Sequence, residues 1–493
     1  MCGKQKTETE SYQRMEKVVP SSLLEALNMR SMELDGRVTY HDLMELVVSD
    51  ANLESALEQV VSNRGSPGID DMSVLELKES FPTMVDSLRE SILEGKYRPK
   101  PVKRVEIPKP NGGTRNLGIP TVTDRLVMQA IYQILMPIYE PTFSECSFGF
   151  RPGRNAHDAI MRVRDLYDEG YTVVVSLDLS KYFDTIPQDD LMILIRSTIK
   201  DRALIDLIKR FLKSGVAMPN GLIVITDEGS PQGSPLSPLL ANIYLDRFDK
   251  EMERRELKEV RYADDVNLYL RTPRAAGRVM ESATRFLEGT LKLTVNREKS
   301  AIGSPMELKF LGFRLCKLED GTTWIRPHEK AVKSFKSRIR EITRRHRGTS
   351  VDTIVRELRS YMRGWFGYFG IGPDISFFDV LDAWVRHRMR AILLVQWKTP
   401  RNRQKQLNRI GGLERTGKRW DDIRRISYKR HVWRASKHIS INYVLNNQKL
   451  KDETGMYYMT DDWEKVQARF PRSPLRSRTV GSVGGRQTTL FDF

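Results

Sequence analysis

The chain has 493 residues, of which 40% are hydrophobic, and its formal net charge at pH 7 is +17. A chain of this length exceeds the usual size of one hydrophobic core, so we expect roughly two to four structural units. The apolar content excludes a chain that is disordered throughout, and the excess of positive charge predicts a polyanionic partner, nucleic acid before an anionic membrane.

Three features of the sequence bear on its location. No stretch approaches about eighteen uncharged apolar residues, and the start of the chain lacks the apolar core of a signal peptide. Cys2, Cys146 and Cys316 lie far apart. We therefore expect a cytosolic protein with reduced thiols and no membrane partner, rather than one with a disulfide framework or a zinc site.

The first part of the chain predicts helices followed by a hairpin. Apolar residues recur at helical spacing over 42–61 and again over 75–93, which predicts core helices. Residues 105–120 flank an Asn-Gly turn, so we expect a β-hairpin whose arms bring Lys109 and Arg115 together. The two cations are either solvated surface charges or a pair that neutralises the phosphates of a nucleotide.

Two loops carry residues suited to a ligand. In 147–155, aromatic rings lie beside Arg151 and Arg154, a combination that stacks on bases and contacts phosphates, so we expect these arginines to line a template groove. Residues 229–238 are too rich in Gly and Pro to be helical. Their glycines allow close approach of the backbone to a ligand, and Gln232 offers both a hydrogen-bond donor and an acceptor.

Two acidic strand ends organise the chain. The apolar run 173–177 ends in Asp178, and 258–270 predicts a β-hairpin with Asp264 near its tip and Asp265 beside it. An isolated Asp-Asp pair is consistent with a solvated turn. A strand ending in Asp next to such a hairpin, however, gathers two or three carboxylates at one sheet edge, where they repel each other unless a divalent cation is bound. Hard oxygen ligands suit Mg²⁺, and two such ions clamp the oxygens of an in-line phosphoryl transfer.

Basic helices follow from about residue 327. Residues 332–345, 351–368 and 377–397 have helical periodicity, the first with an apolar seam on one face and cations on the others. The stretch 397–437 is the most basic of the chain and is interleaved with aromatic residues, which predicts nucleic-acid binding. The candidate contacts are Lys333, Lys336, Arg340, Arg401, Arg403, Arg419, Arg424, Arg425, Lys429 and Arg430.

In this order, the segments 176–184, 229–238 and Arg261-Tyr262-Ala263-Asp264-Asp265 resemble those of reverse transcriptases, and within that class the proteins encoded by bacterial group II introns. The resemblance covers roughly residues 40 to 470. It implies an α/β right-hand polymerase with fingers and palm, an α-helical thumb that is also the maturase part, and a basic helical C-terminal DNA-binding domain. The implied division is 1–45 as an N-terminal extension, 46–320 as fingers and palm, 321–395 as thumb and maturase domain, 396–470 as DNA-binding domain and 471–493 as a tail.

The resemblance assigns roles to single residues. Asp178, Asp264 and Asp265 become the catalytic carboxylates that hold two Mg²⁺ ions, with the carbonyl of Leu179 as a further ligand. The ring of Phe183 is implied to lie under the sugar and exclude a 2′-hydroxyl, although a core aromatic fits the pattern equally well.

Further roles concern the incoming nucleotide and the primer. Lys109 and Arg115 belong to a hairpin that closes on the nucleotide, and the loop of Gln232 packs on the templating base. Lys299 either protonates the pyrophosphate or is a solvated lysine. Residues 309–315 are expected to form a strand whose Gly312 lets the backbone approach the primer end.

The implied function is RNA-directed DNA synthesis in the bacterial cytosol or nucleoid. The protein would also bind its intron RNA, assist splicing and drive intron mobility by target-primed reverse transcription, with deoxynucleotides, an RNA template and a DNA primer as partners. Many relatives end in an endonuclease module with paired cysteines, and no cysteine follows Cys316 here, so we expect no cleavage of the second DNA strand. The alternatives are a domesticated reverse transcriptase of DNA repair or antiphage defence and a non-catalytic RNA-splicing chaperone, which the three intact carboxylates disfavour.

The end of the chain supports a separate hypothesis. A Ser-, Arg- and Gly-rich segment, 473–486, predicts a flexible linker. Gln487, Leu490 and Phe491 after it resemble the peptide that docks in the bacterial sliding clamp, although a short docked end is an equally good interpretation.

Overall fold

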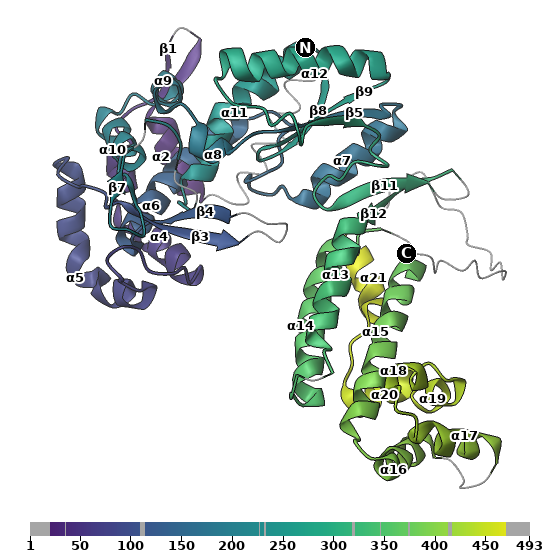
Figure 1. Ribbon diagram of the computed structural model, residues 1–493. Helices are drawn as coiled ribbons and strands as arrows, with labels where there is room; N and C mark the ends of the chain where they lie inside the picture. Colours follow the sequence, from purple (N-terminus) through teal and green to yellow (C-terminus); the bar gives the residue numbers. More distant parts are fainter. Residues whose placement is uncertain are drawn as a thin grey trace. The chain divides into compact units, whose positions relative to one another are not determined.

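The computed structural model describes residues 20–34, 36–108, 114–225, 227–230, 233–317, 321–345, 347–372, 375–412 and 417–469 (Figure 1). It divides the chain into two compact units, one up to Leu311 and the other from Gly312 onward. In the described part, no helix has both the length and the apolar character needed to cross a bilayer.

The first unit begins with helices and a short β-hairpin. They are α2 (Ser21–Met29), β1 (Ser31–Leu34), β2 (Arg37–Tyr40), α3 (Met44–Val47), α4 (Asp50–Ser62) and α5 (Val74–Leu93). The helix expected over 42–61 is interrupted at Ser49, whose ψ of 148° is extended, so α3 and α4 are separate helices. Leu27 of α2 is buried in the core of this unit, so α2 packs with the later helices rather than forming a separate extension.

The predicted hairpin over 105–120 is present. Strands β3 (Val102–Pro108) and β4 (Thr114–Ile119) pair antiparallel, with Ile107 opposite Arg115. With β6 (Val216–Ala217) and β7 (Ile223–Val224) they form a four-stranded sheet in the order β4-β3-β6-β7. Lys109 lies outside the described residues, and so does the side chain of Arg115.

The second sheet carries the acidic strand ends. Its strands are β5 (Val173–Asp178), β8 (Lys258–Tyr262), β9 (Asp265–Leu270) and β10 (Ala301–Gly303), and all pair antiparallel in the order β10-β5-β9-β8. Helices α7 (Ala156–Asp168), α11 (Ser237–Arg254) and α12 (Pro273–Arg285) pack on these strands (Figure 1). The helix expected over 275–291 changes to a π-helical turn at Phe286–Thr290.

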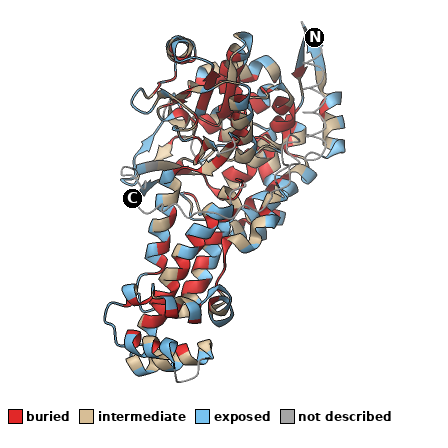
Figure 2. Cartoon of the chain, turned by 90° about the vertical axis from the view of Figure 1, so that its right-hand side faces the viewer, coloured by how far each residue is buried: buried red, intermediate tan, exposed pale blue. Residues whose placement is uncertain are grey.

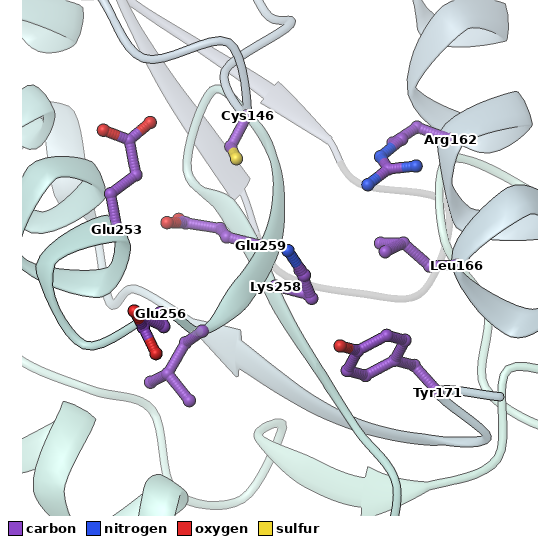
Figure 3. Close-up of a pocket in the computed structure, with 9 residues that line it drawn as sticks. Cys146, Arg162, Leu166, Tyr171, Glu253, Glu256, Lys258 and Glu259 are labelled. Carbon is purple, nitrogen blue, oxygen red and sulfur yellow. The ribbon is translucent and has the colours of Figure 1, made fainter. Parts of the chain in front are cut away.

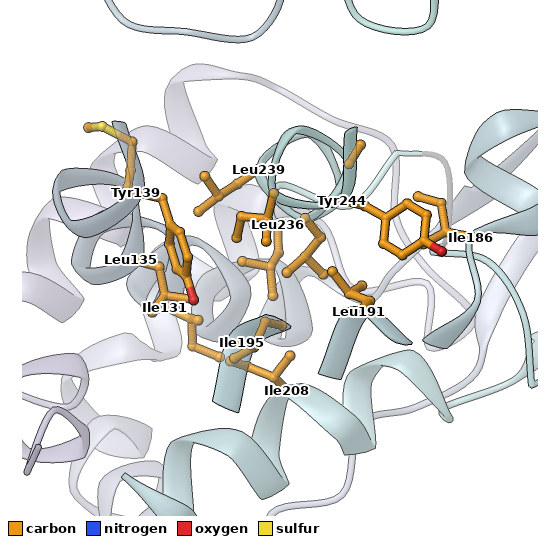
Figure 4. Packing of buried hydrophobic residues seen from close by; sticks show 14 of the residues in the cluster. Ile131, Leu135, Tyr139, Ile186, Leu191, Ile195, Ile208, Leu236, Leu239 and Tyr244 are labelled. Atoms are coloured by element: carbon orange, nitrogen blue, oxygen red, sulfur yellow. The ribbon is translucent and has the colours of Figure 1, made fainter. Parts of the chain in front are cut away.

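Between the sheets lies a core built on one central helix. Helix α6 (Val122–Tyr139) contacts α3, α4, α5 and α11, and it is buried around most of its circumference. Figure 4 shows its Ile131, Leu135 and Tyr139 packed with side chains of α9 (Gln188–Thr198), α10 (Arg202–Leu212) and α11. Two segments near the acidic hairpin pack on this core. One is the turn α8 (Tyr182–Thr185), which contains Phe183, and the other is the start of α11, the helix that precedes the hairpin in the chain.

The second unit is a hairpin followed by helices. Its elements are β11 (Phe313–Lys317), β12 (Thr323–Pro327), α13 (Glu329–Ile342), α14 (Val351–Phe369), α15 (Ile375–Gln396), α16 (Pro400–Gly411), α17 (Lys418–Ser427), α18 (Val432–Ala435), α19 (Ile439–Val444), α20 (Asn447–Thr454) and α21 (Trp463–Gln467). One hydrophobic core runs from Phe335 to Val466, so the boundary expected at 395/396 falls inside a shared core. Figure 2 shows the buried faces of these helices in red and the exposed faces in pale blue.

Two details of this unit concern the start of its first strand and the packing of its last described residues. The strand expected over 309–315 begins only at Phe313, because Leu311 and Gly312 both have positive φ (51° and 85°), which ends an extended strand. Asp382 of α15 is fully buried, and its carboxylate accepts hydrogen bonds from the backbone N–H groups of Met459 and Thr460. This link joins the end of the described chain to α15.

The core around α9 gives a stability prediction. We expect Ile195→Ala to lower the free energy of unfolding by about 2–5 kcal/mol, because it deletes a fully buried side chain and leaves a cavity. The matched control is Ile193→Ala on the same helix, where the side chain is 61% exposed and the change should stay within about 0.5 kcal/mol. Denaturant unfolding followed by circular dichroism measures both. Equal losses in the two variants would contradict this packing.

Candidate active site

Strand pairing brings the acidic residues to one end of a sheet. In the β5–β9 pair Asp178 lies directly opposite Asp265. In the β8–β9 hairpin Tyr262 lies opposite Asp265, which leaves Ala263 and Asp264 as a two-residue tip. Directly opposed residues of antiparallel strands project to the same face with Cβ atoms about 4.5–5.5 Å apart. The predicted hairpin and the predicted meeting of acidic strand ends are therefore both present.

The tip of this hairpin has a constrained backbone. Ala263 has a φ of 57°, in the left-handed region that tight two-residue hairpins require and that residues with a Cβ rarely adopt. Its carbonyl oxygen accepts a hydrogen bond of 3.0 Å from Nη1 of Arg261. The arginine thus holds the turn from the strand that leads into it.

Arg261 is itself fixed by a buried network. Its Nε and Nη2 donate to the two carboxylate oxygens of Asp249 at 2.7 and 2.5 Å, and its Nη1 also donates to Oδ1 of Asn242 at 3.0 Å. The side chains of Arg261 and Asp249 are both completely buried. Because Asp249 and Asn242 lie on α11, the network ties that helix to the acidic turn. A buried ion pair is stable only when its remaining donors and acceptors are satisfied, as they are here.

A second segment braces the same turn. The backbone of 146–148 pairs with Arg261, whose N–H donates to the Cys146 carbonyl while the Phe148 N–H donates to the Arg261 carbonyl, both at 2.9 Å. Asn242 Nδ2 donates to the Gly149 carbonyl at 2.9 Å. A Cβ on Gly149 would lie 2.3 Å from the backbone nitrogen of Ala263, so only glycine fits against the tip.

The arginines of this segment correct the sequence interpretation. The side chain of Arg151 is fully buried, its Nε and Nη2 donate to the Glu140 carboxylate, and its Nη1 donates to the Ser147 carbonyl at 3.0 Å. The side chain of Arg154 is 5% exposed and pairs with Glu145. Neither guanidinium is available at the surface, so the expectation that they line a template groove is wrong. Both instead fix the fold of the loop that braces the acidic turn.

Residues 294–300 surround Asp178. The backbone N–H of Asn296 donates to the Asp178 carbonyl at 2.8 Å, and the Asp178 N–H donates to Oγ of Ser300 at 3.0 Å. Nζ of Lys299 lies 3.6 Å from Oδ2 of Asp178, and its side chain is 67% exposed. Lys299, predicted to act at the nucleotide, therefore lies beside the first carboxylate with its ammonium open to solvent.

The electrostatics at Asp265 favour a bound cation. The residue keeps an exposed side. Burial first, and then the negative charges of Asp264 and Asp178, raise the pKa of the Asp265 carboxyl to about 6, while the positive charge of Lys309 opposes them. Like charges that raise each other's pKa are relieved by a divalent cation, and carboxylate oxygens are its preferred ligands. The chemistry of these residues therefore fits a divalent ion, although in the described part of the chain no three acidic, His or Cys side chains lie close enough together to hold one.

The predicted nucleotide contacts lie partly within the described residues. The ring of Phe183 is half-buried and meets the exposed ring of Phe150 edge-on, with centroids 6.2 Å apart. The Ser230 N–H donates to the Phe183 carbonyl at 2.7 Å, and a Cβ on Gly229 would lie 2.8 Å from the Asp184 carbonyl oxygen. The start of the predicted loop is thus anchored to the turn of Phe183, whereas Gln232 lies outside the described residues.

The predicted nucleic-acid contacts of the second unit fall into two groups. Arg403 is half-buried, and it donates to the carbonyls of Leu394 at 2.7 Å and Ser427 at 3.0 Å, so its role is to join helices. Gly312 lies against the ring of Phe369, which a Cβ would approach to 3.1 Å. The exposed cations are Lys333, Arg340, Arg401, Arg419, Arg424, Arg425, Lys429 and Arg430, while Lys336 is half-buried.

The three residues of the predicted clamp peptide, Gln487, Leu490 and Phe491, lie outside the described residues.

Sequence reasoning missed the residues that support the turn. Arg261 was read only as part of the motif, and Asn242 and Asp249 only as part of a helix. The available signal was an arginine between Val260 and Tyr262 in a predicted strand, with an acid on the preceding helix. Lys309 was also missed, because its charge acts on Asp265 through space rather than through a motif.

Comparison with known proteins gives two family matches. Residues 107–315 match the family model described as reverse transcriptase (RNA-dependent DNA polymerase), and residues 332–411 match the maturase-specific domain of group II introns. The chain is 34% identical to protein YkfC of Escherichia coli over 316 residues, which covers 56% of this chain and 83% of YkfC. It is 39% identical to the group II intron-encoded protein LtrA of Lactococcus lactis over 207 residues, covering 41% of this chain and 34% of LtrA.

The buried network around Arg261 gives a prediction about stability. We expect Arg261→Lys to destabilise the protein by about 3–5 kcal/mol, because one ammonium group cannot satisfy both oxygens of a buried Asp249 together with Asn242 and Ala263. The control is Arg254→Lys, which alters an exposed pair with Glu251 and should leave the melting temperature unchanged. Thermal unfolding of the purified variants is the measurement. A melting temperature of Arg261→Lys equal to that of the wild type would show that the network does not hold the turn.

Proposed function

The chain belongs to the family of group II intron-encoded reverse transcriptases and maturases, and from this premise we propose that it copies RNA into DNA, assists the splicing of its intron and drives the mobility of that intron. One observation carries the catalytic part: Asp178 and Asp265 lie opposite each other on adjacent strands, with Asp264 at the tip between β8 and β9. This is the donor set of a phosphoryl-transfer site, and it lies in the part of the chain that matches the polymerase family.

The three carboxylates would hold the metal ions of the reaction. We assign Asp178, Asp264 and Asp265, with the carbonyl of Leu179, to two Mg²⁺ ions, which would supply Lewis-acid stabilisation of the negative charge that develops in the reaction. The protein's own contribution is position, because the braced turn fixes Asp264 and Asp265 before any substrate binds. Lys299, whose ammonium lies beside Asp178, is proposed to give a proton to the departing pyrophosphate.

The nucleotide would lie between the carboxylates and the β3–β4 hairpin. Lys109, which falls between β3 and β4 in the sequence, and Arg115 of β4 are proposed to neutralise the triphosphate. Gln232 is proposed to contact the templating base or the nucleotide. The ring of Phe183, held by Phe150 and by the backbone contact with Ser230, is proposed to exclude the 2′-hydroxyl of a ribonucleotide.

The second unit is proposed to bind intron RNA and the DNA target. Its part matching the maturase-specific domain includes α13, whose core face is apolar and whose Lys333 and Arg340 are exposed. The following helices present further exposed cations, among them Arg419, whose guanidinium lies 3.6 Å from the ring centroid of Tyr443. Cations interleaved with aromatic rings suit the phosphates and bases of nucleic acid. Docking of the tail on a sliding clamp stays a prediction from the sequence.

The maturase match decides between the proposed function and its alternatives. A domesticated reverse transcriptase of repair or defence would share the chemistry, but it would not need the maturase-specific segment at 332–411. A non-catalytic splicing chaperone would need that segment but not a complete carboxylate set on a braced turn. We therefore favour an enzyme with both functions.

Primer extension on an RNA template with Mg²⁺ and deoxynucleotides tests the catalytic proposal. We expect Asp264→Asn/Asp265→Asn to reduce extension by roughly a thousandfold or more, since it removes metal-binding charge worth several kcal/mol to the transition state. The control is Asp189→Asn, an exposed acid at the start of α9, which should extend normally. Splicing of the intron RNA should continue in the double variant, because the RNA itself is the catalyst. No extension by well-folded wild-type protein would refute the polymerase and favour the chaperone.

Phe183 gives a separate prediction about sugar selection. We expect Phe183→Val to raise the incorporation of ribonucleotides relative to deoxynucleotides by roughly tenfold or more, because the smaller side chain leaves room for a 2′-hydroxyl, and tenfold corresponds to about 1.4 kcal/mol of discrimination. The rate with deoxynucleotides in the same variant is the internal control for folding and catalysis. An unchanged ratio would place the ring in the core rather than at the sugar.

A further inference from the structure

A bulky side chain close to the acidic turn has a backbone conformation that bulky residues rarely adopt. Phe150 has a φ of 60°, in the left-handed region, and the residue is 47% exposed. For an aromatic residue this φ is a strained outlier, and such outliers persist only where the surrounding structure imposes them, most often at functional sites. Packing of the ring in the core does not account for the strain, because the residue is exposed.

The segment before Phe150 is fixed to the palm sheet (β10-β5-β9-β8). Cys146 lines the pocket drawn in Figure 3 together with residues of β8, and its carbonyl accepts a hydrogen bond of 2.9 Å from the Arg261 N–H. At the other end of the segment, a Cβ on Gly149 would collide with the backbone nitrogen of Ala263 at the tip of the hairpin. The backbone that leads into Phe150 is thus held by β8 and by the acidic turn.

The residue after Phe150 is fixed to a different part of the fold. Arg151 is fully buried, and its guanidinium pairs at 2.9 Å with the carboxylate of Glu140, which directly follows α6. Because Gly149 and Arg151 are held by separate elements, the chain has to turn between them. With a left-handed φ at Phe150, the ring stays outside the core.

The exposed ring of Phe150 meets the ring of Phe183. The two centroids lie 6.2 Å apart and the ring planes are inclined at 76°, an edge-to-face contact of the kind that aromatic pairs favour. Phe183 also meets Tyr182 with centroids 5.5 Å apart, and Tyr182 is buried with its hydroxyl donating to the Ala241 carbonyl at 2.6 Å. The ring of Phe183 therefore has a buried neighbour from its own turn and an exposed neighbour from the segment that braces the acidic turn.

We propose that Phe150 is a second residue that determines sugar specificity, because its ring extends the surface that Phe183 presents to the incoming deoxynucleotide and keeps the Phe183 ring from turning away. The inference rests on the proposed polymerase function and on the proposed position of Phe183 at the sugar. A 2′-hydroxyl is excluded only while the Phe183 ring stays in place. Loss of the Phe150 ring therefore weakens sugar selection although Phe183 is intact, and it also removes apolar contact area from the bound nucleotide.

Single-nucleotide primer extension by the full chain on an RNA template tests the inference, with each variant measured on deoxynucleotides and on ribonucleotides. We expect Phe150→Ala to raise the ribonucleotide-to-deoxynucleotide ratio of kcat/KM by roughly fivefold or more, because the ring selects the sugar. The KM for deoxynucleotide should rise by a similar factor at nearly unchanged kcat, because the ring takes no part in the chemistry. Phe150→Tyr keeps the ring and should behave like the wild type. The matched control, Ile193→Ala, removes an exposed apolar side chain of α9 and should change neither value.

Combination with Phe183→Val separates the two effects of Phe150. In the Phe183→Val background, Phe150→Ala should raise the ratio no further, because both changes act on selection through the same ring. The KM for deoxynucleotide should still rise, because the contact of Phe150 with the nucleotide is its own.

Three outcomes would overturn the proposal, and they differ in what else they refute. A ratio that Phe150→Ala leaves unchanged while Phe183→Val raises it would leave Phe183 alone at the sugar and make Phe150 a structural residue. An unchanged ratio in both variants would also refute the position of Phe183 at the sugar. Absence of extension by the folded wild-type chain would refute the polymerase function as well.

Phe150→Gly separates these effects from misfolding. Glycine adopts a left-handed φ without strain, so this variant should melt close to the wild-type temperature. It also lacks the ring, so it should show the same weakened sugar selection as Phe150→Ala. A folded Phe150→Gly with the wild-type ratio would contradict the proposal.

Discussion

A single buried guanidinium holds the acidic turn in place. Arg261 has the turn of its own hairpin on one side and α11 on the other, and its donors are shared among Asp249, Asn242 and the Ala263 carbonyl. Burial of such an ion pair removes both charges from water, which offsets much of the attraction between them. The pair therefore contributes mainly by fixing the positions of the groups that it joins. Helix, strand and turn are joined by one planar group, and a shift of any of them breaks hydrogen bonds in the interior.

The scaffold holds together charges that repel each other. Asp178, Asp264 and Asp265 lie at one sheet end, and burial together with the charges of the other two acids raises the pKa of Asp265. The backbone N–H of Asn296 and the side-chain hydroxyl of Ser300 hold the backbone of Asp178, while Gly149 is packed against the turn at Ala263. Rigid support of this kind is what an electrostatic site requires, because a flexible turn would move its carboxylates apart before substrate arrived. Exposed Lys299 lies beside Asp178 on the solvent side.

The sequence predicted those parts of the site whose signal is local. Strand alternation and the Asp-Asp order were enough to predict the hairpin over 258–270. The acid at the end of the apolar run 173–178 was enough to predict that Asp178 lies close to the acids of that hairpin. What failed was the inference from residue type to exposure. Arg151 and Arg154 have the composition of a nucleic-acid contact, yet Glu140 and Glu145, which are distant enough in the chain to escape a motif, draw them inside. Likewise, periodicity did not reveal the positive φ of Leu311 that ends the strand expected over 309–315.

The strand order of the palm sheet has a consequence for synthesis on the ribosome. Strand β5 is made first, yet it lies inside the sheet, between β9 and β10, which are the later parts of the chain. Until residue 303 has emerged, one or both edges of this apolar strand lack partners, and unpaired apolar edges invite association with other chains. The nascent chain therefore has its first acid long before it has a complete site. The three carboxylates of the site come together only when strands made later pair with β5, the strand of this sheet that is made first.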